Sequence, residues 1–171
     1  MNKITLIIIV FSLFACNSQN ATNKKSPLLE YEINQLLNNW HYDAATSNHE
    51  QYIGTMSSDA VYIGTDATEY WTQPDFAKWS KPYFDKKKTW NFKLVKRNIY
   101  FSSNNTVAWF DELLETGLGL CRGSGVLELT DNTWKIKQYV LSPTIPNNMI
   151  GEIVKSKKEA DSLIVVKFRQ K

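Results

Sequence analysis

The spacing of apolar residues changes along the chain, from a helical period in the first half to a strand period in the second. From residue 27 to about residue 45, apolar residues recur every three or four positions. This pattern predicts a helix with Ser26 as its cap and Pro27 in its first turn. Ser47–Glu50 fits a capping box, so a short second helix is expected to follow and to bury Met56.

Two further elements complete the first half. In residues 59–63 the side-chain pattern changes to the two-residue period that is typical of a strand. Thr72 is followed by Pro74 and Asp75, so a third helix is expected to begin there, with the acid near the positive end of the helix dipole. The lysines at 86–88 are expected to end this helix, because positive charge is favourable at a helix C-terminus.

The second half predicts an antiparallel sheet. A long strand is expected at about 89–102, and three more strands between residues 106 and 146. Turn signals at Thr116–Gly117 and Asp131–Asn132 separate these three strands. Helices gathered on one side of an antiparallel sheet make an α+β domain, and this sheet is expected to wrap one side of a pocket.

The first residues are typical of a bacterial lipoprotein signal. Lys3 precedes an apolar run at 4–14, which is too short to span a bilayer as a mature helix. The ending Leu13–Cys16 resembles a lipobox, which implies cleavage before Cys16 and lipid attachment to it. Asn17 follows in place of an Asp, which favours the periplasmic face of the outer membrane over the inner membrane. The alternative is an ordinary secretory signal with an incidental cysteine.

Composition narrows the possible functions. The formal net charge of +3 is small and scattered, so nucleic acid is not expected as a partner. The 6 Trp, 8 Tyr and 8 Phe favour either a bulky core or an aromatic-lined cavity. Cys121 is expected to be a small apolar filler, since no disulfide partner remains once Cys16 is lipidated. His41 and His49 lack metal-ligand spacing, so neither a metal nor another cofactor is expected.

Four segments carry a resemblance to a known family: 64–71 (GTDATEYW), 108–112 (AWFDE), 122–127 (RGSGVL) and 134–147 (WKI, then SP and IPN). Together they resemble the SnoaL-like branch of the nuclear transport factor two-like superfamily, over about residues 28–147. The resemblance implies a cone-shaped, curved antiparallel sheet wrapped around three N-terminal helices and enclosing a pocket. The superfamily includes ketosteroid isomerases, polyketide cyclases, dehydratases and non-catalytic modules, so the fold does not settle the function.

The expected domain organisation follows from these features. The four parts are a signal peptide (1–15), a polar tether (16–26), a SnoaL-like domain (27–148) and a C-terminal extension (149–171). For the extension, the pattern favours a short helix at 149–162 and a short strand at 163–168.

Asp111 and Glu112 are the first candidates for chemistry. They are adjacent on an expected strand and so point to opposite faces, and one of them is expected to face the pocket. A carboxyl group among aromatic rings would have a raised pKa, which suits general acid or base catalysis. The alternative is a buried carboxylate that is paired with Arg122 on the next strand and holds the sheet together.

Asp66 is the second candidate, in a loop expected near the pocket mouth. It would bind a substrate hydroxyl or act as a base. The alternative is that Asp66 forms a local turn while Glu69 faces water. Further residues are expected in the pocket wall, the last of them as a polar residue on an apolar strand face: Trp71, Trp79, Phe84, Trp90, Trp109, Arg122 and Gln138.

Two functions fit this pattern. The first is an envelope-tethered domain that binds a small apolar or aromatic molecule; as an enzyme it would be an isomerase, cyclase or dehydratase that uses acid-base catalysis without a metal. The second is a non-catalytic module of the envelope that dimerises or holds a partner protein through the sheet. The apolar character of both strand faces around Trp109 and Phe110 motivates this alternative.

Overall fold

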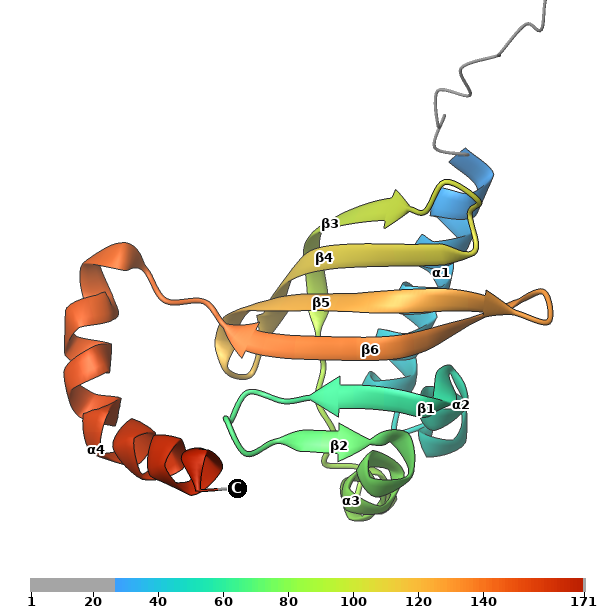
Figure 1. Ribbon diagram of the computed structural model, residues 1–171. Helices are drawn as coiled ribbons and strands as arrows, with labels where there is room; N and C mark the ends of the chain where they lie inside the picture. Colours follow the sequence, from blue (N-terminus) through green and yellow to red (C-terminus); the bar gives the residue numbers. More distant parts are fainter. Residues whose placement is uncertain (1–26, 171) are drawn as a thin grey trace, which may run out of the picture.

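The computed structural model describes residues 27–170 (Figure 1). The predicted signal peptide, Cys16 and the tether therefore lie outside the described residues. Within them, three helices and a six-stranded sheet are followed by a fourth helix. None of the helices between residues 27 and 170 combines the length and the apolar character that crossing a bilayer requires.

The three expected helices are present: α1 (Pro27–Ala45), α2 (His49–Gly54) and α3 (Gln73–Asp85). Thr72 caps α3 as predicted, because its hydroxyl accepts a hydrogen bond from the backbone N–H of Asp75. The capping box predicted for α2 is wrong. Its N-cap is Asn48, without a side-chain bond, while the Ser47 hydroxyl meets that of Thr89 at 3.2 Å.

Six strands form one sheet in the order β2-β1-β6-β5-β4-β3. They are β1 (Met56–Ile63), β2 (Tyr70–Thr72), β3 (Lys93–Phe101), β4 (Val107–Thr116), β5 (Gly119–Thr130) and β6 (Thr133–Pro143). Met56, expected in the second helix, begins β1 instead, and β2 was not predicted. All neighbouring strands are antiparallel except β1 and β6, which run parallel, so the sheet is mixed.

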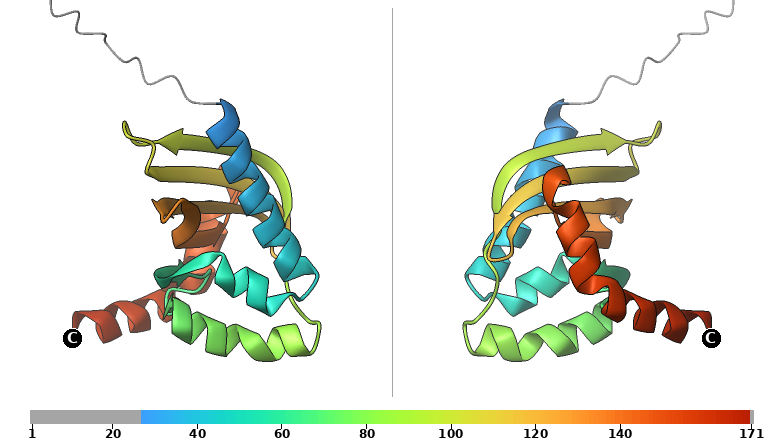
Figure 2. Two further views of the ribbon diagram at one scale, coloured as in Figure 1. Left: turned by 90° about the vertical axis from the view of Figure 1, so that its right-hand side faces the viewer. Right: turned by 90° about the vertical axis from the view of Figure 1, so that its left-hand side faces the viewer.

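The core lies between the helices and one face of the curved sheet. Figure 2 shows α1 crossing that face, with α3 beside β1 and β2. Alternation places every second residue of β4 on the inner face. These inner residues, Ala108, Phe110, Glu112 and Leu114, are all buried, and they meet the buried stripe of α1, which includes Ile33, Leu37 and Trp40.

After a short 3-10 turn (Asn147–Met149), the chain ends in α4 (Ile150–Arg169). The strand predicted at 163–168 is wrong, because the helix continues through it. The preceding strand, β6, already has β1 and β5 on its two sides, so no adjacent position is free for another strand. A helix satisfies its own backbone hydrogen bonds without such a partner. None of the described residues of α4 is buried, and the helix stands apart from the sheet (Figure 1).

Candidate functional site

A cavity of about 520 Å³ opens at one end of the sheet. Its wall combines the end of β1, the β1–β2 loop, β2, α3, the α3–β3 connection, the β4–β5 turn and one residue of β6. Five aromatic residues line it: Tyr62, Trp71, Trp79, Trp90 and Phe92. The other lining residues are Gly64, Thr65, Glu69, Thr89, Asn91, Thr116, Gly117, Leu118 and Leu141.

The tryptophans of the wall are stacked on one another. The ring centroids of Trp71 and Trp79 are 4.6 Å apart with an interplanar angle of 28°, and those of Trp79 and Trp90 are 6.2 Å apart with an angle of 27°. Stacked rings support one another and present a broad apolar surface. Trp79 is 38% exposed, so part of the apolar surface that the tryptophans form is open to a ligand.

Two tyrosines at this end of the sheet are buried, Tyr62 in the cavity wall and Tyr52 in the core. Burial raises the pKa of Tyr52 and of Tyr62, so both phenols are neutral at physiological pH. The Trp90 indole N–H is buried and approaches the Tyr52 hydroxyl without reaching a hydrogen bond. Among the described side chains, this indole is the one buried polar group without a hydrogen-bond partner.

Glu69 is the one charged residue among those that line the cavity. The backbone N–H of Asp66 donates to its Oε2 at 3.1 Å, which folds the side chain back over the loop. Gly64 makes room for it, since a Cβ at Gly64 would lie only 2.2 Å from Oε2. The negative charge of Glu69 adds to the effect of burial in raising the pKa of Tyr62. Glu69 therefore takes part in the cavity wall, although the turn interpretation expected it to face water.

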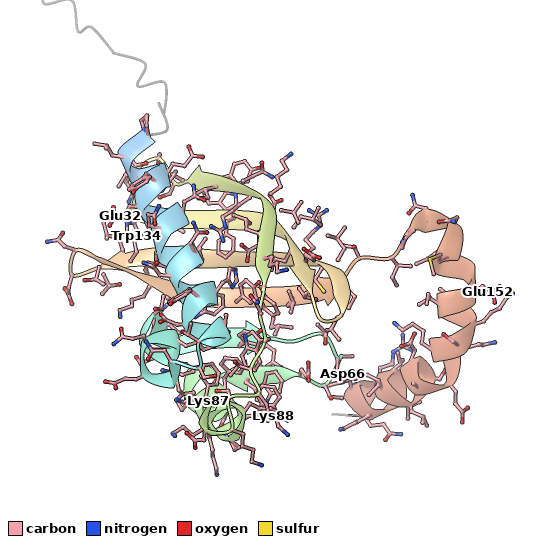
Figure 3. The ribbon with its side chains drawn as sticks, turned by 180° about the vertical axis from the view of Figure 1, so that it is seen from behind. Glu32, Asp66, Lys87, Lys88, Trp134 and Glu152 are labelled. Atoms are coloured by element: carbon pink, nitrogen blue, oxygen red, sulfur yellow. The ribbon has the colours of Figure 1, made fainter. Side chains whose placement is uncertain are left out.

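Asp66 forms the local turn. Its Oδ1 accepts hydrogen bonds from the backbone N–H of Thr68 at 2.8 Å and from the Thr68 hydroxyl at 2.6 Å. These bonds lower the pKa of Asp66. The residue is exposed on the β1–β2 loop, outside the cavity lining (Figure 3). This geometry fits the turn interpretation and gives Asp66 no contact with the cavity.

Glu112 is the inward-facing member of the Asp111–Glu112 pair, and it is completely buried. Its Oε1 accepts hydrogen bonds from His41 Nε2 at 2.8 Å and from the Tyr139 hydroxyl at 3.0 Å. Its Oε2 accepts from Arg97 Nε at 2.9 Å and from Arg97 Nη2 at 2.7 Å. Both carboxylate oxygens are therefore satisfied, and Glu112 does not line the cavity.

The raised pKa expected for the inward carboxyl is wrong. Burial alone would raise the pKa of Glu112, but the hydrogen bond and charge of His41, together with those of Arg97, lower it below its ordinary value. The alternative interpretation, a buried and paired carboxylate, fits Glu112, but the partner is Arg97 on β3 and not Arg122. Arg97 lies directly opposite Glu112 in the β3–β4 register.

Gly123 makes this buried cluster sterically possible. A Cβ on Gly123 would lie 2.4 Å from the Tyr139 hydroxyl and 2.9 Å from Glu112 Oε1. Gly125 similarly leaves space for the ring of Phe110. Both glycines therefore make room for side chains of the neighbouring strands β4 and β6.

Asp111 belongs to the outer face of the sheet. Its carboxylate accepts a hydrogen bond from Asn98 Nδ2 at 3.1 Å and lies 3.6 Å from Arg122 Nη1. On the same face, Trp109 stacks on Tyr100 with their ring centroids 5.9 Å apart, and each is 45% exposed. Trp109 and Arg122, predicted for the pocket wall, therefore lie on the opposite side of the sheet.

Gln138 also faces outward, because a β-bulge changes the alternation of β6. Leu127 pairs with Ile136, but its neighbour Val126 pairs with Gln138, so Lys137 is the extra residue. The bulge ends the run of inward residues at Ile136 and resumes it at Tyr139, leaving Gln138 exposed. The prediction that Gln138 lies in the pocket wall on an apolar strand face is therefore wrong.

The remaining predicted residues divide between the cavity wall and the core. Trp71, Trp79 and Trp90 line the cavity, whereas Phe84 is buried in the core against Tyr52. Cys121 is buried and within 3.4 Å of the Thr116 hydroxyl. Within residues 27–170, no group of three or more His, Cys, Asp or Glu side chains is placed to hold a metal ion.

The sequence interpretation missed His41, Arg97 and Tyr139 as partners of Glu112. A signal for His41 was present, since it follows Leu37 by four residues on the buried stripe of α1. Arg97 has no such local signal, because its contact with Glu112 depends on the register between two strands.

Comparison with known proteins identifies the family. The family model described as a SnoaL-like domain matches residues 33–146. An NTF2-like protein of unknown function from Pseudomonas putida is similar to the chain with a TM-score of 0.62 at 14% identity, over 71% of this chain and 91% of that one. A domain of unknown function with a cystatin-like fold from Nostoc punctiforme gives a TM-score of 0.62 at 12% identity, over 85% and 99%.

A third similar structure is an NTF2-like protein from Cytophaga hutchinsonii, with a TM-score of 0.56 at 12% identity, over 67% of this chain and 98% of that one. Identities this low show the fold alone. Comparison with curated protein sequences gave no significant match. Since the family model covers two thirds of the 171 residues and the sheet and helices have the arrangement expected from the resemblance, the chain belongs to the SnoaL-like domain family.

Proposed function

We propose that this protein binds a small molecule, with apolar or aromatic character, in the cavity at the end of its sheet. The observation that carries the proposal is the cavity itself, about 520 Å³ in volume and walled by five aromatic residues. Ligand sites in proteins are typically clefts of this size with mostly apolar walls and few polar groups. SnoaL-like domains commonly hold a ligand-binding or enzymatic pocket, which agrees with this assignment.

The positions of the candidate carboxylates favour ligand binding and argue against catalysis by Glu112. That residue is buried in a cluster with Arg97 and His41 and does not reach the cavity. Asp111 lies on the outer face, and Asp66 is engaged in its own turn. Glu69 is the carboxylate that a ligand in the cavity would meet, so any proton transfer there falls to Glu69.

Two measurements test the binding proposal. Mass spectrometry of small molecules released from the purified protein on denaturation identifies a bound compound, and a thermal-shift screen ranks candidate ligands. Trp79→Ala removes a cavity wall residue and should weaken binding of any identified ligand by about tenfold. Trp109→Ala is the matched control, because this tryptophan is similarly exposed but lies on the opposite face. Equal effects of the two substitutions would contradict the proposal.

The proposed place of action is the bacterial envelope, with the domain tethered through a lipid on Cys16. The lipobox-like Leu13–Cys16 and the polar residues 17–26 support this placement. Metabolic labelling with a fatty-acid analogue should mark the full-length protein and fail with Cys16→Ala. Fractionation of the labelled protein into the inner membrane would contradict the outer-membrane address.

A second candidate function is self-association or partner binding through the outer face of the sheet. The half-exposed Trp109–Tyr100 stack favours it, together with exposed Val95 on the same edge strand as Tyr100. Light scattering of the purified protein tests this function. A concentration-dependent dimer that Trp109→Glu converts to a monomer would support it, and a monomer at all concentrations would exclude a homodimer.

A further inference from the structure

The charges of the cavity wall are unbalanced. Glu69 is its one charged side chain, and the fourteen lining residues include no lysine, arginine or histidine. Among the described residues, Glu69 forms no ion pair: the eight pairs found there join other acids. The cavity therefore presents a negative charge that the cations of residues 27–170 leave unpaired.

The aromatic residues of the wall also favour a positively charged ligand. The face of an aromatic ring carries negative potential, and tryptophan attracts cations most strongly of the three aromatic residues. Trp71, Trp79 and Trp90 all line the cavity, with interplanar angles of 28° between Trp71 and Trp79 and 27° between Trp79 and Trp90, and Tyr62 shares the cavity with Glu69. Such a combination of tryptophan rings and one carboxylate is suited to a cation that carries apolar groups.

We infer that the ligand is an organic ammonium ion, whose charge lies near the Glu69 carboxylate and whose apolar part packs against the Trp71–Trp79 stack. This inference rests on the proposed function, because it names the ligand class for the same cavity. An anionic ligand would meet Glu69 without a compensating cation in the wall. Lys87 and Lys88 follow α3 (Figure 3), but both are exposed and neither lines the cavity. Solvent therefore screens their positive charges from a ligand in the cavity.

Three probes that share one aromatic ring test the sign of the preferred charge. They are 2-phenylethylammonium, neutral 2-phenylethanol and anionic phenylacetate, and isothermal titration calorimetry gives the dissociation constant of each. The ammonium ion should bind about tenfold more tightly than the alcohol, since it adds charge pairing and cation–π attraction to the same ring contact. Phenylacetate should bind more weakly than the alcohol.

Glu69→Gln isolates the role of the carboxylate. It should bring the ratio of the two affinities, 2-phenylethylammonium over 2-phenylethanol, close to one. Glu115→Gln is the matched control, because this exposed carboxylate precedes the lining residue Thr116 but does not line the cavity. The control should keep the preference for the ammonium ion.

The outcomes separate this inference from the proposed function. If the alcohol binds at least as tightly as the ammonium ion, or if Glu69→Gln keeps the preference, the inference is overturned while binding in the cavity stands. If none of the three probes binds and the ligand screen finds a neutral or anionic compound, the inference is again overturned. If neither the probes nor the screen yields a ligand, both proposals fail.

Discussion

Arg97 and Glu112 face each other across β3 and β4, and the guanidinium donates from both Nε and Nη2 to one carboxylate oxygen, at 2.9 and 2.7 Å. Arg97 Nη1 also donates to Asn38 Oδ1 at 2.9 Å and to Asn34, both on α1. The arginine therefore joins the edge strand β3 to α1. With His41 and Tyr139 on the other oxygen, it lets a charged group occupy the core.

Removing Arg97 should strongly destabilise the fold. Arg97→Met leaves the buried Glu112 carboxylate without its main counter-charge, which costs about 3–5 kcal/mol in the free energy of unfolding. Arg122→Met is the control, since the outer Arg122–Asp111 pair is largely exposed and contributes at most about 1 kcal/mol. Urea denaturation of both variants measures the difference, and similar losses would contradict the role assigned to Arg97.

The lowered pKa of Glu112 predicts an acid-sensitive fold. Because the folded-state pKa lies below the ordinary value of 4.5, the unfolded chain binds a proton before the folded one does as the pH falls. The stability from this group is fully present above pH 4.5 and is lost as the pH falls through the folded pKa. Glu112→Gln, which cannot ionise, should show a flatter decline of the unfolding free energy across that window. Denaturation curves at a series of pH values measure how the unfolding free energy of each protein changes with pH. Equal changes in the original protein and in Glu112→Gln would rule out the contribution of Glu112.

Gly123→Ala should disturb the buried cluster. The added methyl group would collide with the Tyr139 hydroxyl and with Glu112, and overpacking of this kind costs about 1–3 kcal/mol. Gly54→Ala is a control, because a Cβ at Gly54 meets no atom within 4 Å and this residue has no positive φ. Thermal and urea unfolding should show the loss only for Gly123→Ala, and an unchanged midpoint would mean that the cluster has more room than its geometry indicates.

Deleting α4 should leave the domain intact. None of residues 149–170 is buried, so the unfolding free energy of a chain that ends at residue 148 should change by less than about 0.5 kcal/mol. Calorimetry of the shortened and full-length proteins tests this. A lower melting temperature of the shortened protein at every protein concentration would show that the helix supports the fold. A lower melting temperature only at high protein concentration would indicate that α4 contributes to self-association.

The sequence by itself determined the local elements and the faces of most strands. The helical period of α1 and the Thr72 cap of α3 depend on residues a few positions apart, so they can be recognised without the fold. Strand alternation likewise determined that Asp111 and Glu112 point to opposite faces. The segments that resemble the SnoaL-like family supplied the arrangement of helices and sheet.

Only the tertiary structure decided which of these faces is buried and what each side chain meets there. The pairing of Arg97 with Glu112 depends on strand register, and the outward turn of Gln138 depends on a bulge opposite β5. The place of Glu69 in the cavity depends on a loop that packs beside segments distant in the sequence. These contacts are set by long-range packing, which local periodicity does not encode, so the candidate site became visible only in the folded chain.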